Sequence, residues 1–448
     1  MPCIRNSRPI ARLSAFVHFT QYLQIADTGT EAGTWDLIGL NVPEHLQGGT
    51  YSTAMTLIWS FKRPRSRNPV NIAIVNRLGE EAMTWLRAAS TLFGLLASSL
   101  AATASDVPPG YPASYGKVIE AAEKEGTLVI YANTEQFAVN PILEDFQKAY
   151  PKVSVDYLEI KAADLYGRVS SEAAAGALKG DFVWSSAMDL QFQLADEGVA
   201  ATYASVEKPN VPEWSTWKDQ LYGVTFEPVV FVYNKKLIAE ADVPQTRAGL
   251  ATFLETRKQA LAGKAASYDP ERSGLGFFAV SHDARISDDL WKVVQGFGAA
   301  KAKFYTATGT MLEKVSSGEH AIAYNIIGPY ALLKAEKDPN IGIVMPSDYT
   351  LILSRIAFVP KAAPHPNAGR LFLDYLLSKR GQHVIANQAL LYSIRSDVQG
   401  RATAAQLTAQ HGAVLKPVAI GPELMSDLDP AKRLPFFDRW NKALAAGR

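Results

Sequence analysis

From residue 115 onward, the chain alternates between segments whose apolar residues recur every three or four positions and short runs that are apolar throughout. The first pattern is typical of amphipathic helices and the second of buried strands. The segment 115–126 places Val118, Ile119 and Ala122 on one helical face and ends at a glycine, and the run TLVIYA follows at 127–132. These patterns predict a helix that leads directly into a buried strand.

The alternation continues to about residue 379. A helix beginning at Pro141, a strand over 153–160, a helix over 162–178 and a buried strand over 181–186 come next. Further helices are predicted over 187–198, near 236–260 and over 274–280, 286–298, 309–318, 329–336 and 366–379, with strands over 320–326 and 341–346. This order predicts an α/β fold with parallel, doubly wound sheets, which bind ligands at the carboxyl ends of their strands.

Two further predicted strands, 221–235 and 350–360, are unusually long and contain few turn signals. Strands of that length can run from one lobe of a protein into another. We therefore expect a two-lobed body with a cleft and a two-strand hinge, an arrangement in which the lobes close on a ligand.

An export signal is predicted well inside the chain. It begins at Met83 and combines the basic Arg87, an apolar run over 91–100 and the small-x-small pattern of 102–104. We expect 83–104 to be a signal peptide cleaved after Ala104, which would place the mature protein in the periplasm. An uncleaved anchor or a buried helix is the alternative, although the apolar run is only about half of the roughly 20 residues that a bilayer crossing needs.

Residues 1–82 show no sustained period of 2 or 3.6, so they contain no core-forming pattern. We expect them to be either a leader translated from a start codon assigned too early or a disordered or small extra N-terminal region. The basic cluster KRPRSR at 62–67 and the single cysteine, Cys3, both fall there. The mature protein would then have no disulfide and no basic surface for nucleic acid.

The composition is that of an ordinary soluble globular protein, with 48% hydrophobic and 20% charged residues and a formal net charge of +1. The usual signatures of hydrolases, zinc proteases and nucleotide-binding loops do not occur, and none of the seven histidines has metal-pair spacing. We therefore expect neither a catalytic step nor a cofactor, and a secreted enzyme is only a remote alternative.

Several segments together carry a family resemblance. They occur in the order GTLVIYANTEQ, GDFVWSSAMDLQFQLADEGV, VTFEPVVFVYNKKLI, YDPERSGLGFF, AIAYNIIGPYALLKAEKDPNIGIVMP and SRIAFVPKAAPHPNAGRLFLDYLLSKRGQ. In this order they resemble the type 2 periplasmic substrate-binding proteins of ABC importers, in the ferric-ion-type branch. The resemblance covers roughly residues 115–400.

The resemblance implies two α/β lobes joined by two crossing strands, with the ligand held between them. Lobe one would comprise 105–226 plus 350–400 and lobe two 227–349, with 401–448 packed back on the body. Such a protein works as a monomer that delivers a small-molecule or metal ligand to an ABC permease in the inner membrane. A periplasmic ligand-sensing subunit of a signalling system uses the same fold and is the alternative.

The strongest candidate for a ligand site is the segment that contains Asp269, Arg272, Ser273 and Gly274, just before a predicted helix. Free backbone N–H groups and the positive end of the helix dipole would meet an anion there, and Arg272 would add a charge. In the alternative interpretation, Ser273 only caps the helix and Arg272 is a solvated surface charge.

Two further candidates follow predicted strands of the first lobe. Asn133, Thr134 and Glu135 follow the first strand, and Ser185 and Ser186 follow the apolar FVW run. Their positions at strand ends favour a ligand site, and ordinary turns or caps are the alternative.

The remaining candidates lie near the second lobe and the hinge. Tyr324 and Asn325 lie near the end of the predicted strand 320–326, Arg355 lies in the returning strand, and Glu227 interrupts an apolar strand. Arg355 could bind a carboxylate or phosphate through two hydrogen bonds, or form an interlobe salt bridge instead. Glu227 could face the cleft or hold the hinge.

The nature of the ligand stays open at this point. Ferric-ion binders of the resembled branch carry adjacent tyrosines in the second lobe, often with a histidine and a glutamate from the first. This chain has Tyr324 and Tyr330 but no tyrosine pair, and its first-lobe loop has Glu135 but no histidine. We expect an anionic organic solute such as an organophosphate or carboxylate, with ferric iron, bound by Glu135 and Tyr324, as the other possibility.

Overall fold

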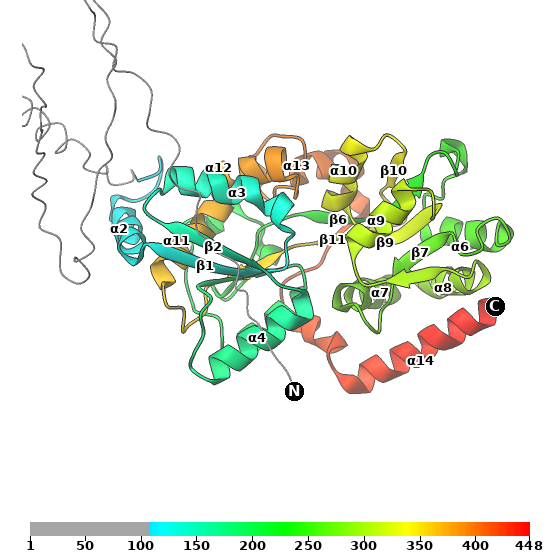
Figure 1. Ribbon diagram of the computed structural model, residues 1–448, viewed down its shortest axis with the longest axis horizontal. Helices are drawn as coiled ribbons and strands as arrows, with labels where there is room; N and C mark the ends of the chain where they lie inside the picture. The colour runs from blue at the N-terminus through cyan, green and yellow to red at the C-terminus, as the bar shows by residue number, and fades with distance from the viewer. Residues whose placement is uncertain (1–106) are drawn as a thin grey trace, which may run out of the picture. The chain divides into compact units, whose positions relative to one another are not determined.

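Two β-sheets, each flanked by helices, organise the part of the chain that the structure describes (Figure 1). The structure is a computed structural model and describes residues 107–448. The predicted leader and signal peptide, 1–104, lie outside the described residues. Among the described residues, no helix is both long and apolar enough to cross a membrane.

The first sheet has six strands. Their order is β2 (Ser154–Glu159), β1 (Thr127–Ala132), β3 (Phe182–Ser185), β12 (Ile356–Phe358), β5 (Leu221–Gly223) and β4 (Thr216–Trp217). The strand β1 runs parallel to β2 and β3, whereas β12, β5 and β4 join antiparallel. The helices of this lobe are α2 (Gly116–Glu125), α3 (Gln136–Ala149), α4 (Ala162–Ala174), α5 (Met188–Asp196), α11 (Pro366–Leu377) and α12 (Lys379–Val384).

The second sheet has seven strands. The path runs β13 (Leu415–Pro417), β11 (Thr350–Leu353), β6 (Glu227–Asn234), β9 (Ile322–Ile327), β7 (Ala265–Tyr268) and β8 (Lys303–Tyr305), and β10 (Ile341–Val344) pairs with β6. The strands β9, β7 and β8 are parallel, and β6 is antiparallel to its neighbours β9, β10 and β11. The helices of this lobe are α6 (Arg247–Thr256), α7 (Gly274–Ile286), α8 (Asp289–Ala299), α9 (Thr308–Ser316) and α10 (Gly328–Lys337).

The two-strand hinge predicted from the sequence is confirmed. Each of the two long predicted strands divides into a strand of one sheet and a strand of the other: β5 continues as β6, and β11 continues as β12. The prediction of parallel sheets holds only for the strands that helices connect. The sheets are mixed because the crossing strands β6 and β12 run antiparallel to their neighbours.

The local signals place most element boundaries correctly. Gly126, with φ of 71°, ends α2 in the left-handed conformation that a glycine adopts without strain, and its carbonyl accepts the N–H of Ser154 at the start of β2. The strand β3 is buried along its whole length, as its apolar run predicted. It therefore lies at the centre of the first lobe's core.

Two predicted elements differ from the structure. The helix predicted to begin at Pro141 begins at Gln136, because the extended Glu135 ends the preceding loop and the chain tolerates a proline, which lacks an N–H, inside the helix. The helical segment near 236–260 contains a 3₁₀ turn and then α6, which starts only at Arg247, after Pro244. The strands β4, β7, β8 and β13 were not predicted.

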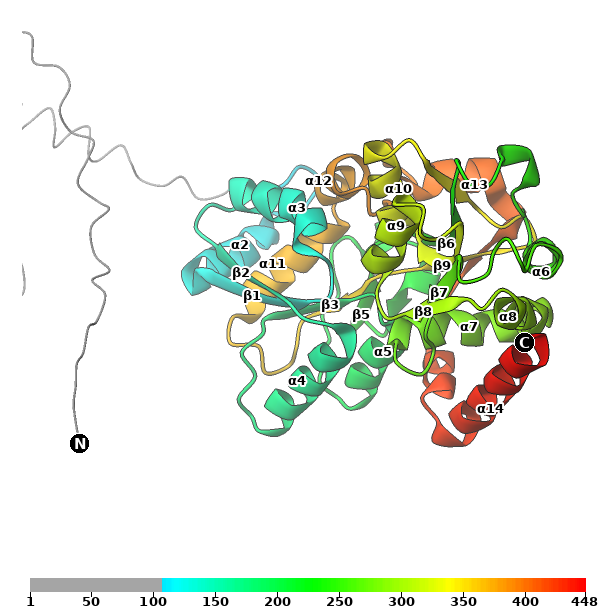
Figure 2. The same cartoon turned by 45° about the vertical axis from the view of Figure 1, so that its right-hand side comes forward.

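The chain after α12 leaves the first lobe and returns to it. It forms α13 (Ala404–His411), adds β13 to the edge of the second sheet beside β11, and continues through the 3₁₀ helix η7 (Pro422–Asp427) to α14 (Pro430–Gly447). Both views show α14 below the second lobe, and it packs on α8 (Figure 1 and Figure 2).

Candidate functional site

The carboxyl ends of the parallel strands and the helices that follow them make up the candidate site. In the first lobe, β1 leads into α3 and β3 leads into α5; in the second lobe, β7, β8 and β9 lead into α7, α9 and α10. Within residues 107–448, no side chain caps the first turn of α5, α9 or α10. The N–H groups of these turns can therefore donate to an anion.

Arg355 lies at the centre of the hinge and is 1% exposed. Its Nε and Nη2 donate to the two carboxylate oxygens of Glu227, at 2.7 and 3.3 Å. Its Nη1 donates to Thr134 Oγ1 in the first lobe at 3.0 Å, and its Nη2 also donates to the Tyr330 hydroxyl in the second lobe at 3.1 Å. One guanidinium thus contacts both lobes and both crossing strands, which is the interlobe salt bridge considered from the sequence.

Two residues at or just after the loop that follows β1, Glu135 and Phe137, lie close to the second lobe. The carboxylate oxygen Oε1 of Glu135 lies 3.8 Å from the point that a Cβ of Gly309 would occupy in the first turn of α9. The ring of Phe137, 57% exposed, lies 6.3 Å from the ring of Tyr330. This loop is therefore the part of the first lobe that meets α9 and α10.

Partial burial raises the pKa of Glu135, and the neighbouring Glu159 carboxylate adds to this rise while Arg355 opposes it. Within the described part of the chain, no hydrogen bond or ion pair of the Glu135 carboxylate is found. Burial likewise raises the pKa of Glu227, against the opposing effect of Arg355. Glu135 is thus an acceptor between the lobes that is open to a ligand.

The other first-lobe candidates bind one another. Asn133 Nδ2 donates to Ser186 Oγ at 2.9 Å, and the Ser186 N–H donates to Asn133 Oδ1 at 3.0 Å. The Ser185 hydroxyl accepts the N–H of Ala187 at 3.1 Å in the turn before α5. These contacts join the ends of β1 and β3.

The loop before α7 is shaped by its own side chains. Asp269 Oδ1 accepts the N–H groups of Glu271 and Arg272, and Ser273 Oγ accepts the N–H of Gly276 at 3.1 Å. Ser273 therefore caps α7, while Gly274 and Arg272 are exposed. Among the described residues, no hydrogen bond or ion pair of the Arg272 guanidinium is found.

Tyr324 and Asn325 lie in a buried network inside the second lobe. The Tyr324 hydroxyl donates to Asp283 Oδ2 at 2.7 Å and accepts from Arg247 Nε at 3.1 Å. Asn325 Nδ2 donates to the same Asp283 oxygen at 2.9 Å. Burial and the Asp283 carboxylate raise the pKa of Tyr324, which disfavours a phenolate.

Several residues at the lobe boundary were not predicted. Tyr330 begins α10 with Gly328 and Pro329, and burial raises the pKa of its hydroxyl. The hydroxyls of Tyr268 and Thr308 are hydrogen-bonded, and the Tyr157 hydroxyl donates to the Thr134 carbonyl. The proline at the start of α10, directly after a strand, was the signal that could have identified Tyr330.

No group of three or more His, Cys, Asp or Glu side chains able to hold a metal ion occurs among residues 107–448. The two iron ligands predicted from the sequence, Glu135 and Tyr324, lie apart, because Glu135 faces the second lobe whereas Tyr324 is buried within it.

Comparisons with known proteins agree with this architecture. The family described as bacterial extracellular solute-binding protein matches residues 142–410. The substrate-binding protein of an ABC transporter from Agrobacterium tumefaciens is 40% identical, with a TM-score of 0.68, over 71% of this chain and 94% of that one. No match was found among curated protein sequences.

Two more distant structures show the same fold. The periplasmic binding protein AfuA from Actinobacillus pleuropneumoniae, with fructose-6-phosphate bound, is 18% identical, with a TM-score of 0.59, over 71% of this chain and 98% of that one. Iron-bound HitA from Pseudomonas aeruginosa is 20% identical, with a TM-score of 0.54, over 71% of this chain and 99% of that one.

Proposed function

The chain belongs to the bacterial extracellular solute-binding proteins of ABC transporters, and we propose that its solute is a small organic anion that carries hydroxyl groups. The family implies a periplasmic location. We propose that the signal beginning at Met83 directs export and that a membrane permease receives the solute. The protein performs no catalytic step in this account.

The observation that carries the proposal is the set of uncapped helix starts, α5 from the first lobe and α9 and α10 from the second. Such first turns donate N–H groups and favour negative charge. Arg272, exposed at the start of α7, adds a positive charge on the same edge of the second sheet. A phosphate or carboxylate between the lobes would satisfy these donors together.

Glu135 indicates which hydrogen-bonding groups the solute carries besides its negative charge. As an ionised carboxylate it only accepts hydrogen bonds, so a solute at α9 must present a donor to it. Hydroxyl groups beside a phosphoryl or carboxyl group meet this requirement, as in sugar phosphates. The bound sugar phosphate of AfuA, a protein of the same fold, is consistent with this class.

Iron fits the same residues less well. Ferric binding by Tyr330 requires a phenolate, whereas burial raises the pKa of that hydroxyl and Arg355 already donates to it. Tyr324 is committed to Asp283 and Arg247. Neither tyrosine is arranged as a hard oxygen ligand for iron.

The proposed mechanism is closure of the lobes. Asn133, Thr134, Ser185 and Ser186 would line the first-lobe side, and Asp269, Ser273 and Gly274 would border the second. Arg355 and Glu227 hold the hinge. The solute favours the closed state because it contacts both lobes only there.

The test is isothermal titration calorimetry of the full chain with sugar phosphates, phosphonates, dicarboxylates and Fe(III). We expect one organic anion to bind and Arg272→Ala to weaken it at least tenfold, since a charged hydrogen bond contributes about 1.5–3 kcal/mol. The control is Arg257→Ala, at an exposed arginine that follows α6. Binding of Fe(III) alone, or equal weakening in both variants, would contradict the proposal.

A further inference from the structure

We propose that the C-terminal segment, residues 415–448, is a third link between the lobes that moves with the second lobe and separates from the first when the protein opens. We call this segment the strap. The proposal concerns the opening motion and does not depend on which solute binds.

The strap contacts both lobes in turn. Its β13 pairs with β11 of the second sheet. Ile420 then donates its N–H to the carbonyl of Trp214 at 2.8 Å, in the 3₁₀ turn Glu213–Ser215 that leads into β4 of the first sheet. Next, η7 packs on α5 of the first lobe, and α14 packs on α8 of the second. The lobes therefore share more than the two crossing strands.

The contact between the strap and the second lobe is close. Gly298 of α8 lies so near α14 that a Cβ there would overlap the carbonyl oxygen of Leu444, and a Cβ at Gly447 would overlap the carbonyl oxygen of Gln295. Backbones that touch in this way cannot shift without losing contact along the helix.

Aromatic packing reinforces this interface. Phe436 of α14 lies 5.3 Å from the rings of both Phe277 and Trp291, and Arg439 lies 4.0 Å above Trp291. Trp440 is 2% exposed. A cavity of about 380 Å³ lies beyond this aromatic cluster, and Ala446 and Gly447 at the end of the strap line part of it.

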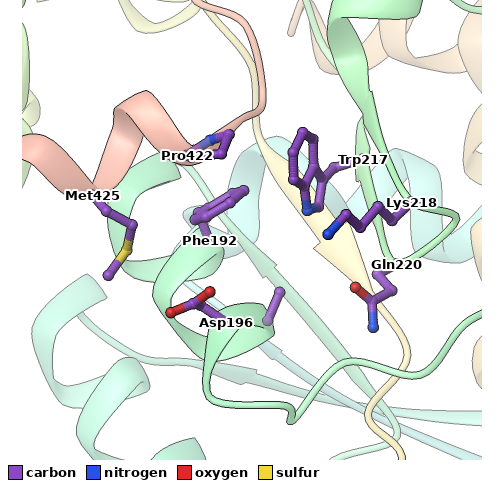
Figure 3. A pocket seen from close by; sticks show the side chains of 8 residues that line it. Phe192, Asp196, Trp217, Lys218, Gln220, Pro422 and Met425 are labelled. Carbon is purple, nitrogen blue, oxygen red and sulfur yellow. The ribbon is translucent and has the colours of Figure 1, made fainter.

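The contact between the strap and the first lobe is smaller, because only η7, whose Leu424 is buried, and the residues just before it take part. A cavity of about 520 Å³ lies between η7, α5 and the turn that joins β4 to β5. Figure 3 shows Pro422 and Met425 of η7 on one side and the rings of Phe192 and Trp217 beside them. Side chains that line such a space forgo dispersion contacts on one side.

The difference between the two interfaces determines where the strap separates. Opening the lobes must break one of its attachments, and the interface with fewer packed contacts breaks at lower cost. The strap therefore stays on α8, while η7 moves away from α5 across the cavity.

The test covalently joins each interface in turn, in the full chain with Cys3→Ser. A bismaleimide joins η7 to α5 through Ala195→Cys and Met425→Cys; the matched control joins α8 to α14 through Gln295→Cys and Ala446→Cys. The exposed Lys117 and Lys337 are each replaced by an amino acid with a ketone side chain, to which a spin label is attached. Pulsed electron paramagnetic resonance then measures the distance between the lobes.

We expect the unlinked protein without solute to show a short and a longer distance. The first link should abolish the longer population, and the control link should leave it unchanged. The proposal is overturned if the unlinked protein shows only the short distance, if the first link has no effect, or if both links act equally. Unlinked double-cysteine variants must show the parent distances, which excludes an effect of the substitutions themselves.

Discussion

Arg355 and Glu227 form an ion pair with two hydrogen bonds, of 2.7 and 3.3 Å, and their side chains are 2% and 1% exposed. Glu227 is the first residue of β6, and Arg355 immediately precedes β12. The pair therefore joins the two crossing strands where they pass between the sheets. The buried charge of each residue depends on the other.

Replacing Arg355 alone should destabilise the protein strongly. Arg355→Met leaves the Glu227 carboxylate buried without its partner, and the expected loss in the free energy of unfolding is about 3–5 kcal/mol. Urea unfolding of the full chain measures it. The double variant with Glu227→Met should recover most of the loss, and a single-variant loss under about 1 kcal/mol would contradict this role.

Glu135→Gln should stabilise the protein at neutral pH. Folding raises the pKa of Glu135, so the folded state holds this proton more tightly and ionisation destabilises the fold. The advantage of the variant should be present at pH 7.5 and shrink as the pH falls through the folded pKa toward 4.5. Urea midpoints at both pH values measure this.

The control for this prediction is Glu120→Gln, at an exposed position on α2. It should change stability by less than about 0.5 kcal/mol at either pH. An equal gain in both variants, or a gain for Glu135→Gln that grows at low pH, would show that the raised pKa of Glu135 is not the cause of the gain.

Asp374 on α11 should make stability depend on pH in the opposite direction to an ordinary ion-paired carboxylate. It accepts hydrogen bonds from the hydroxyls of Tyr115, Tyr203 and Ser205, but burial outweighs them and raises its pKa from 3.8 to about 6. The stability from its bound proton is complete below pH 3.8 and is lost as the pH rises to about 6.

Asp374→Asn cannot lose this proton. Relative to the unsubstituted protein, the variant should therefore gain roughly 2–3 kcal/mol between pH 4 and pH 7, whatever its stability at pH 4. Chemical unfolding across this range measures the difference. A constant difference between the two proteins would contradict the raised pKa.

Tyr324→Phe should affect stability and leave solute binding unchanged. The change removes the hydroxyl between Asp283 and Arg247 inside the second lobe, at an expected loss of about 1–3 kcal/mol. Tyr330→Phe, at the lobe boundary, is the matched comparison and should change solute affinity. Calorimetry and urea unfolding of both variants distinguish the roles, and weaker solute binding by Tyr324→Phe would return that residue to the site.

The hydrophobic pattern correctly predicted those strands and helices that local sequence alone determines. The strand β1 matches its predicted range, Thr127–Ala132, because its apolar run is bounded by a glycine and a polar loop. The strands β7 (Ala265–Tyr268) and β8 (Lys303–Tyr305) are too short to show a clear alternation of apolar and polar residues. Pairing with β9 makes β7 a strand, and pairing with β7 makes β8 one, which no local pattern records.

Only part of the candidate site could be predicted from the sequence. Strand-end reasoning selected Asn133 and Ser186 as separate candidates, and their hydrogen bonds to each other were not predicted. For Tyr324 the sequence could not show the buried network, because Asn325 has φ of 58° and the pairing of β9 with β6 shifts register, so alternation does not tell which face a side chain occupies. The partners of Arg355 come from segments far apart in the chain, and only the fold shows their proximity.

The most direct test of the central claim is a thermal-shift measurement of the full chain with organic phosphates and carboxylates in parallel with Fe(III). A solute at 100 times its dissociation constant stabilises the folded state by about 2.7 kcal/mol, which raises the melting temperature by several degrees. We predict such a rise with a hydroxylated organic anion and none with Fe(III). A rise with Fe(III) alone would contradict the account.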